Sequence, residues 1–444
     1  MKTTPSRHRR ILGETAWVFF GQGMSAIATL VGLRLITELV SPDVYGTVAL
    51  TLGVVLLAHG LAVGPLMQAV LRYYPDVAVG GGEHDLRRAA LTALRRPLFI
   101  ALAALVLVAT GWSVVEPEHA WLALLSATLF LAEAARSVEI TFLNAARRQR
   151  VMALVVIADA WLRPVGAVVM VWVWGAHGAA VMAGYLVGAA VALLAYWAAV
   201  RSTRRASSDT AGAALVAIDL PRRLRTYARP LTALPLIGWV SGQADRYLVG
   251  GLAGLAAAGV YAALYGLASK PFLMLASSIE LALRQPYYAR VSAADHRGAQ
   301  RLLGIWLASV LVLALVTCSA FVLLHAEIAS VLLAAEYRSH SALMGWIAAG
   351  YVLLSAAQVF ERVCYAYHDT PGVLGVQAAG ALLSIAIAAP LVWRYGIEGA
   401  AWAVPAYFGA QLLLTLARAA YVWQRARPQH PALARPHIAD VARP

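Results

Sequence analysis

Ionisable side chains occur inside several long apolar stretches of this 444-residue chain. The basic ones are Arg34, Arg136, Arg163, Arg246, Lys270 and Arg362, and the acidic candidates are Glu133, Glu139, Asp159, Asp245 and Glu361. A charge at the centre of a bilayer costs at least about 2.5–3.5 kcal/mol, so charges that persist there usually face a polar cavity. The set predicts a net positive, water-accessible cavity in which the basic residues bind an anionic solute and the acidic ones couple transport to protons or ions.

Some of these residues are spaced for contact within one helix, where positions three or four apart are neighbours. The groups are Asp159 with Arg163, Glu133 with Arg136 and Glu139, and Arg34 with Glu38. Pro164 follows the first pair and frees a backbone carbonyl, which favours a kink there. Each group has two interpretations: part of a solute pathway, or an ion bridge that only holds helices together.

Lys270 and Arg246 have no such neighbour. Lys270 has no acidic residue three or four positions away, and Asp245, adjacent to Arg246, points elsewhere on a helix. Lys270 therefore needs a partner on another helix, a substrate anion or water. We expect both residues to contribute positive potential to the cavity.

The elements that must position these side chains are about twelve apolar stretches of about 20 residues, the length a helix needs to cross a bilayer. The predicted spans are 14–38, 44–71, 94–115, 119–143, 151–174, 177–200, 229–251, 257–283, 302–325, 341–365, 372–393 and 399–423.

Basic residues alternate with these spans. If the N-terminus is cytoplasmic, most of the 36 basic residues lie in inside connections, and the outside connections hold only Arg338 and Arg394. The outside connections lean acidic, with Glu38, Asp43, Glu116, Glu118, Glu327 and Glu336. Because positively charged loops stay cytoplasmic during insertion, this pattern predicts that both termini are cytoplasmic.

Composition excludes several classes of protein. A chain that is 61% hydrophobic and 13% charged is not an ordinary soluble domain. Its net charge of +14 comes from basic residues in short connections beside the spans, where they interact with anionic lipids. No nucleic-acid partner is therefore expected. Cys318 and Cys364 both fall within spans, and there is no GxxxxGK[ST] motif, so we expect no disulfide, metal or other cofactor.

The chain contains an internal repeat. Residues 175–189 align with 396–410, including Gly175 with Gly396 and Gly178 with Gly399, and the pair Val44-Tyr45 is matched by Val260-Tyr261. Both repeats occupy equivalent places among the spans, which indicates two parallel six-span halves. The predicted domains are an N-terminal six-helix bundle (1–200), a basic cytoplasmic linker with an amphipathic interfacial helix (201–228), a C-terminal six-helix bundle (229–424) and a cytoplasmic tail (425–444).

A family resemblance rests on Gly21 and Arg34 in the first span, the segment Ser41-Pro42-Asp43-Val44-Tyr45-Gly46, and Gln68 to Pro75. The second half repeats this pattern from Gly259-Val260-Tyr261 to Pro286-Tyr287-Tyr288. Over nearly its whole length the chain resembles the polysaccharide-biosynthesis oligosaccharide flippases of the multidrug/oligosaccharidyl-lipid/polysaccharide exporter superfamily. The resemblance implies an all-α polytopic membrane protein with a MATE-like fold.

The same resemblance implies a function. Such a protein would translocate an undecaprenyl-pyrophosphate-linked oligosaccharide across the bacterial inner membrane by alternating access, for O-antigen, capsule or exopolysaccharide synthesis. Its partners would be this lipid-linked substrate, inner-membrane lipids, and a glycan polymerase with other assembly proteins. Three alternatives stay open: a MATE-type multidrug exporter, whose cationic drugs would favour an acidic cavity, a polytopic glycan ligase or polymerase, and a membrane scaffold. The short outside connections disfavour an enzyme.

Overall fold

A computed structural model describes residues 7–78, 82–115, 120–204 and 219–429. These residues are almost all helical and include no strand. Ten of the helices are long and apolar enough to cross a membrane. The expected all-α, polytopic architecture is therefore confirmed.

The chain forms two compact units, each described here by itself. The first consists of Met1–Trp239 together with a separate short segment, Ser330–Tyr337. The second consists of Val240–Ala329 and Arg338–Pro444. Half of the linker predicted at 201–228 and most of the tail predicted at 425–444 lie outside the described residues, as do Glu116 and Glu118.

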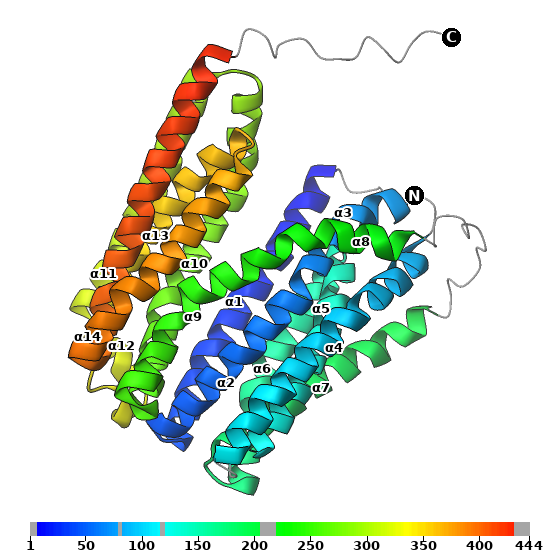
Figure 1. Ribbon diagram of the computed structural model, residues 1–444. Helices are drawn as coiled ribbons and strands as arrows, with labels where there is room; N and C mark the ends of the chain where they lie inside the picture. Colours follow the sequence, from blue (N-terminus) through cyan, green and yellow to red (C-terminus); the bar gives the residue numbers. More distant parts are fainter. Residues whose placement is uncertain (1–6, 79–81, 116–119, 205–218, 430–444) are drawn as a thin grey trace. The chain divides into compact units, whose positions relative to one another are not determined.

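The first unit is a helical bundle with a short helix added to it (Figure 1). Its elements are α1 (Arg7–Leu39), α2 (Pro42–Ala62), α3 (Gly64–Ala78), α4 (Glu83–Val115), α5 (Ala120–Ala145), α6 (Gln149–Trp174), α7 (Gly178–Arg204), α8 (Leu220–Ala228) and the 3-10 turn η2 (Arg229–Thr232). Six of these, α1, α2 and α4 to α7, match the six spans predicted for this half.

The second predicted span, 44–71, is wrong at its end. The helix stops at Ala62, and a new helix, α3, starts at Gly64 after a break at Val63. Pro65 explains the break, because a proline in the first turn of a helix has no N–H to continue the preceding one. The residues that follow, including Arg72, therefore belong to an amphipathic helix rather than to the span.

Small residues let α6 pack closely on its neighbours. A Cβ placed on Gly184 of α7 would clash with the backbone of Gly166 and Ala167 of α6. On the other side of α6, Pro164 lies against Gly32 of α1, where an added Cβ would come within 2.7 Å of the proline Cβ. The helix α6 runs without interruption from Gln149 to Trp174, with Pro164 inside it.

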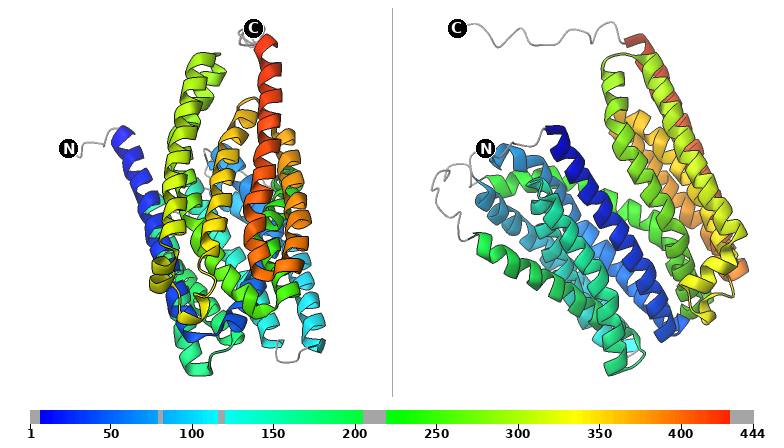
Figure 2. Two further views of the ribbon diagram at one scale, coloured as in Figure 1. Left: turned by 90° about the vertical axis from the view of Figure 1, so that its left-hand side faces the viewer. Right: turned by 180° about the vertical axis from the view of Figure 1, so that it is seen from behind.

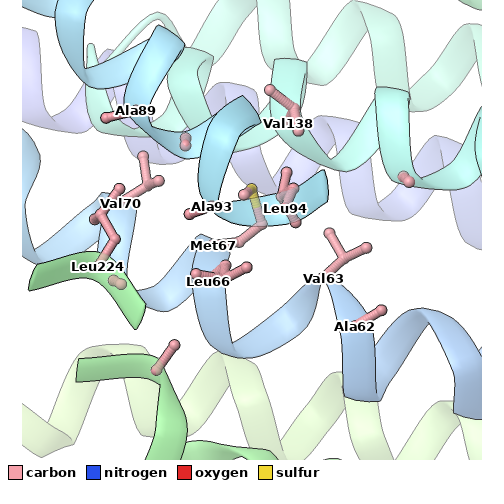
Figure 3. Packing of buried hydrophobic residues seen from close by; sticks show 14 of the residues in the cluster. Ala62, Val63, Leu66, Met67, Val70, Ala89, Ala93, Leu94, Val138 and Leu224 are labelled. Atoms are coloured by element: carbon pink, nitrogen blue, oxygen red, sulfur yellow. The ribbon is translucent and has the colours of Figure 1, made fainter. Parts of the chain in front are cut away.

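An apolar core joins α2, α3, α4, α5 and α8 at one end of the first unit (Figure 3). Leu66, Met67 and Val70 of α3 face Ala93 and Leu94 of α4 (Figure 3). All five side chains are at most 5% exposed. This core fixes α3, which at 15 residues is too short to span, against the end of the bundle.

The second unit is built from long helices that extend side by side (Figure 2). Its elements are most of α9 (Ala233–Ala253), α10 (Leu255–Ser292), α11 (His296–Leu323), the start of α12 (His325–Leu332), α13 (Leu343–Ala366) and α14 (Thr370–Gln429). The helix α9 matches the seventh predicted span, but it is not among the ten candidate membrane spans. Gln243, Asp245 and Arg246 lower its hydropathy.

The helix α14 is two helices joined at a kink. Gly396 has φ +60° and ψ −133°, so the backbone turns there, and the predicted spans 372–393 and 399–423 lie on either side. Gly175, its predicted repeat partner, also has a positive φ, +101°, between α6 and α7. Both positions need glycine because L-residues rarely adopt such angles. The repeat therefore places one equivalent turn in each half.

Candidate functional site

Four ionisable residues of the first unit form one ion network between α5 and α6. Arg136 contacts Glu133 at 2.7 Å, and Arg163 contacts Asp159 at 2.9 Å through helical spacing. Arg163 also pairs with Glu133 across the two helices, and the Arg136 Nε atom lies 3.8 Å from Asp159. Two guanidinium groups and two carboxylates therefore neutralise one another.

This arrangement confirms the Asp159–Arg163 and Glu133–Arg136 contacts predicted from spacing. It also shows that Arg136 and Arg163 add no net positive charge at this place, because each is held by a carboxylate. The side chains are only 11–25% exposed, so the network is partly screened from solvent. As candidates for binding an anion, both arginines would first have to give up a partner.

Glu139 does not belong to this network, contrary to the expectation that it shares a helix face with Glu133 and Arg136. Six positions correspond to 600°, so Glu139 and Glu133 lie about 120° apart around α5. Glu139 is instead buried against other helices, where it pairs with Arg87 of α4 and accepts hydrogen bonds from Tyr196 (3.2 Å) and Trp197 (3.0 Å) of α7. Arg87 lies outside the predicted span 94–115, and α4 includes it because this helix begins already at Glu83.

Arg34 has the partner that its spacing predicts and a second one that no pattern showed. It pairs with Glu38 on α1, and its guanidinium also donates to the carbonyl oxygen of Leu333. Leu333 belongs to the short segment Ser330–Tyr337 that completes the first unit. Arg34 therefore holds a piece of backbone in place.

Arg246 of α9, in the second unit, lies among polar and aromatic groups and has no carboxylate partner among the described residues. Its guanidinium donates to Gln243 and lies 4.9 Å from the centre of the Tyr265 ring. Its Nε atom is buried without a hydrogen bond. Asp245 turns away, as predicted, and accepts from the Tyr261 hydroxyl at 2.7 Å.

Lys270 of α10 is half-buried and meets neither a carboxylate nor a hydrogen-bond acceptor among the residues that the structure describes. The ring of Tyr265, which faces Arg246, is on the same helix, five residues earlier. Lys270 and Arg246 thus leave the second unit with two partly buried cations that its own acidic groups do not pair.

Arg362 of α13 is paired with an acidic residue from another helix. Its Nη2 atom lies 3.1 Å from Glu280 of α10, and Glu280 also pairs with Arg284 at 3.1 Å. Two arginines therefore share one carboxylate. The Nε atom of Arg362 is buried without a partner.

Glu361, the neighbour of Arg362, is only 4% exposed. Its carboxylate accepts from the Gln377 amide at 3.3 and 3.4 Å and has no ion pair among the described residues. A buried carboxylate with amide partners alone is costly in its charged form, so it is suited to taking up a proton. Asp245, 6% exposed and held by Tyr261, has the same character.

The structure therefore separates the candidates into two classes. Paired groups are Arg34, Arg136, Arg163, Arg362, Glu133, Glu139 and Asp159. Those without an ionic partner in the described part of the chain are Arg246, Lys270, Asp245 and Glu361. The second class lies in the second unit. Within the described chain, no three His, Cys, Asp or Glu side chains gather as a metal site would require.

Sequence comparisons find no match to a protein-family model and no curated protein of similar sequence. Solved structures do match. A lipid II flippase, MurJ, in an inward closed conformation has a TM-score of 0.69 at 12% identity, with 94% of this chain and 91% of that chain covered. An inward-facing multidrug resistance MATE transporter has a TM-score of 0.68 at 13% identity, with 92% and 96% covered.

A third match is a transporter of the MOP superfamily from Pyrococcus furiosus, whose structure is described as having a binding pocket of reverse polarity. It has a TM-score of 0.58 at 14% identity, with 94% of this chain and 95% of that chain covered. At such identities the likeness concerns the fold. The chain has the fold of MurJ and of the MATE transporters.

Proposed function

We propose that this protein is a flippase that translocates an undecaprenyl-pyrophosphate-linked oligosaccharide across the bacterial inner membrane by alternating access, for surface polysaccharide synthesis. The observation that carries the proposal is Lys270, a half-buried ammonium in an apolar helix that meets no acidic side chain within the described ranges. Together with Arg246 it gives the second unit positive potential that a diphosphate would neutralise. The fold shared with a lipid II flippase supports the same class of function.

Within this proposal the roles of the other residues differ. Lys270 and Arg246 attract the diphosphate directly. Arg136, Arg163 and Arg362 would reach it only by exchanging a carboxylate for it, which can make binding depend on conformation. Asp245 and Glu361 are the carboxylates that we assign to proton or ion coupling, because no arginine or lysine holds them charged.

A second candidate is export of cationic solutes, as in the MATE transporters with this fold. It is favoured by the same two buried carboxylates, Asp245 and Glu361, which could attract a cation. The two candidates differ in the charge that the solute must meet. A flippase needs the positive charge of Lys270, whereas an exporter of cations should transport its solute faster when this charge is removed. The structures named above are of transporters, and we propose no enzymatic reaction.

The test is a flipping assay in proteoliposomes that contain the purified protein and a fluorescent lipid-linked oligosaccharide. We expect wild-type protein to flip the lipid, Lys270→Ala to abolish flipping, and Lys270→Arg to retain part of it. The matched control is Arg297→Ala, which removes one positive charge from an exposed residue without a partner among the described residues.

Flipping by Lys270→Ala at the wild-type rate would contradict the proposal. Faster efflux of ethidium by the same variant, without lipid flipping by any variant, would favour the cation exporter. Amounts of folded protein in the membrane must be equal across the variants, since a half-buried lysine can also affect folding.

A further inference from the structure

The helix α8, between the two halves of the chain, is amphipathic. Leu220, Leu224 and Ala228, at four-residue intervals, are at most 4% exposed and belong to the apolar core of the first unit. Figure 3 shows Leu224 next to Val70 of α3. The apolar face of α8 is thus covered by the protein and is not available to insert into lipid.

The opposite face of α8 is basic and exposed. Arg222, Arg223 and Arg225 all point to the surface. Arg223 pairs with Asp219 at 3.3 Å, but Arg222 and Arg225 meet no carboxylate among the residues that the structure describes. Because the helix is anchored by its other face, these guanidinium groups are held in position.

An open recess of about 310 Å³ lies between this face and α3. It is lined by Tyr73, Asp219, Arg222, Arg223, Thr226 and Tyr227. The rings of Tyr73 and Tyr227 pack edge to face, with their centres 5.9 Å apart, and the Arg72 guanidinium lies 5.8 Å from the centre of the Tyr73 ring. Guanidinium forks, phenol hydroxyls and a threonine hydroxyl therefore share one small site.

We propose that this recess binds the phosphodiester headgroup of an anionic phospholipid such as phosphatidylglycerol. Arginine forks and hydroxyl groups are the donors that recognise phosphate oxygens. Of the two arginines in the recess, Arg223 is already neutralised by Asp219, which leaves the one positive charge of Arg222. That balance matches a singly charged phosphodiester better than a diphosphate. Positioned basic groups next to a bilayer meet such lipids in the cytoplasmic leaflet.

The experiment titrates the detergent-solubilised full-length protein with phosphatidylglycerol and counts bound lipid by native mass spectrometry. We expect Arg222→Gln to weaken binding about fivefold, because one basic residue at an anionic surface contributes about that factor. Adding Arg223→Gln should weaken it further, because Asp219 then loses its partner and its negative charge repels the phosphodiester. The matched control removes the same charge elsewhere by Arg297→Gln and Arg301→Gln, both exposed residues of α11. Control binding should equal that of wild type.

Three results would overturn the proposal. Equal losses in the control and the α8 variants would show only a diffuse basic surface. A loss of undecaprenyl diphosphate binding with phosphatidylglycerol binding unchanged would assign the recess to the transported lipid. Inorganic phosphate that competes at the same concentration as the lipid would indicate a site for a free anion. The readout is lipid binding, so it holds or fails independently of whether the protein is a flippase.

Discussion

Buried charged residues in this protein differ in what neutralises them. Spacing in the sequence identified Asp159 with Arg163, Glu133 with Arg136, and Arg34 with Glu38, and all three contacts exist. Local spacing could not find partners on other helices, because those depend on how helices pack. The Glu280–Arg362 and Arg87–Glu139 pairs are of that kind.

The network of the first unit predicts unequal effects of single substitutions. Arg163→Gln should destabilise the protein by about 3–5 kcal/mol, because Glu133 and Asp159 both lose a buried partner. Asp159→Asn should cost less, since Arg163 keeps Glu133. The double variant should recover part of the loss, because Glu133 and Arg136 remain paired. Thermal unfolding in detergent measures all three.

The control for this series is Arg284→Gln. Its pair with Glu280 is more open, with 39% of the arginine side chain exposed, so a change of at most about 1 kcal/mol is expected. If the double variant is no more stable than Arg163→Gln, the network does not act as a coupled unit.

A second prediction concerns pH. Asp369, in the turn before α14, is bound by Arg418 at 2.6 and 2.7 Å, and these hydrogen bonds hold the pKa of its carboxyl below its ordinary value. A lowered pKa means that the pair stabilises the protein at neutral pH and that this contribution is lost as the pH falls through the folded-state pKa. The Tm difference between wild type and Arg418→Gln should therefore be largest near pH 7 and vanish under strongly acidic conditions. A difference that stays constant down to about pH 2 would contradict this.

At the scale of elements, the unexpected one is the segment Ser330–Tyr337. Its backbone N–H at Ala334 donates to Thr37 at 3.2 Å, and the Tyr337 hydroxyl donates to the carbonyl of Val40 at 2.9 Å. Burial raises the pKa of Tyr337, which keeps this hydroxyl protonated as a donor. Leu333 and Tyr337 are fully buried. The segment is thus a structural part of the end of α1.

Tyr337→Ala should release this segment, because it removes a fully buried ring and a hydrogen bond, at a cost of about 3–5 kcal/mol. Limited trypsin digestion should then cut faster after Arg338. Cleavage after Arg297, an exposed residue in the first turn of α11, serves as the internal control and should not change. Tyr337→Phe, which keeps the ring, should have a much smaller effect. Equal cleavage in all three proteins would show that the segment is held by other contacts.

The sequence predicted most of the elements, since long apolar stretches, the glycine repeat and the loops were sufficient to place them. The prediction failed where a proline ends a helix or where a contact between residues far apart in the sequence fixes the position of a segment. Pro65 divides the second span from α3. The docking of residues 330–337 on α1 had no local signal, because its partners are about 300 positions away.

At the scale of the whole molecule, the distribution of basic residues predicts that both termini are cytoplasmic. Single cysteines test this in a background with Cys318→Ala and Cys364→Ala, the two free thiols. A membrane-impermeant maleimide added to intact spheroplasts should label the Ser339→Cys variant and spare Arg297→Cys. Both positions are exposed, and both should react after permeabilisation. Labelling of Arg297→Cys alone in intact spheroplasts would reverse the topology.

The discontinuous make-up of the first unit also sets an order of synthesis. Its main stretch ends at Trp239, but Ser330–Tyr337 leaves the ribosome roughly ninety residues later, on the order of 5–20 s at ordinary rates of translation. During that interval the hydroxyl of Thr37 and the carbonyl of Val40 lack their final partners. The half that is made first is therefore completed only while the second half is being made, and its end at α1 must wait in the membrane until Ser330–Tyr337 arrives.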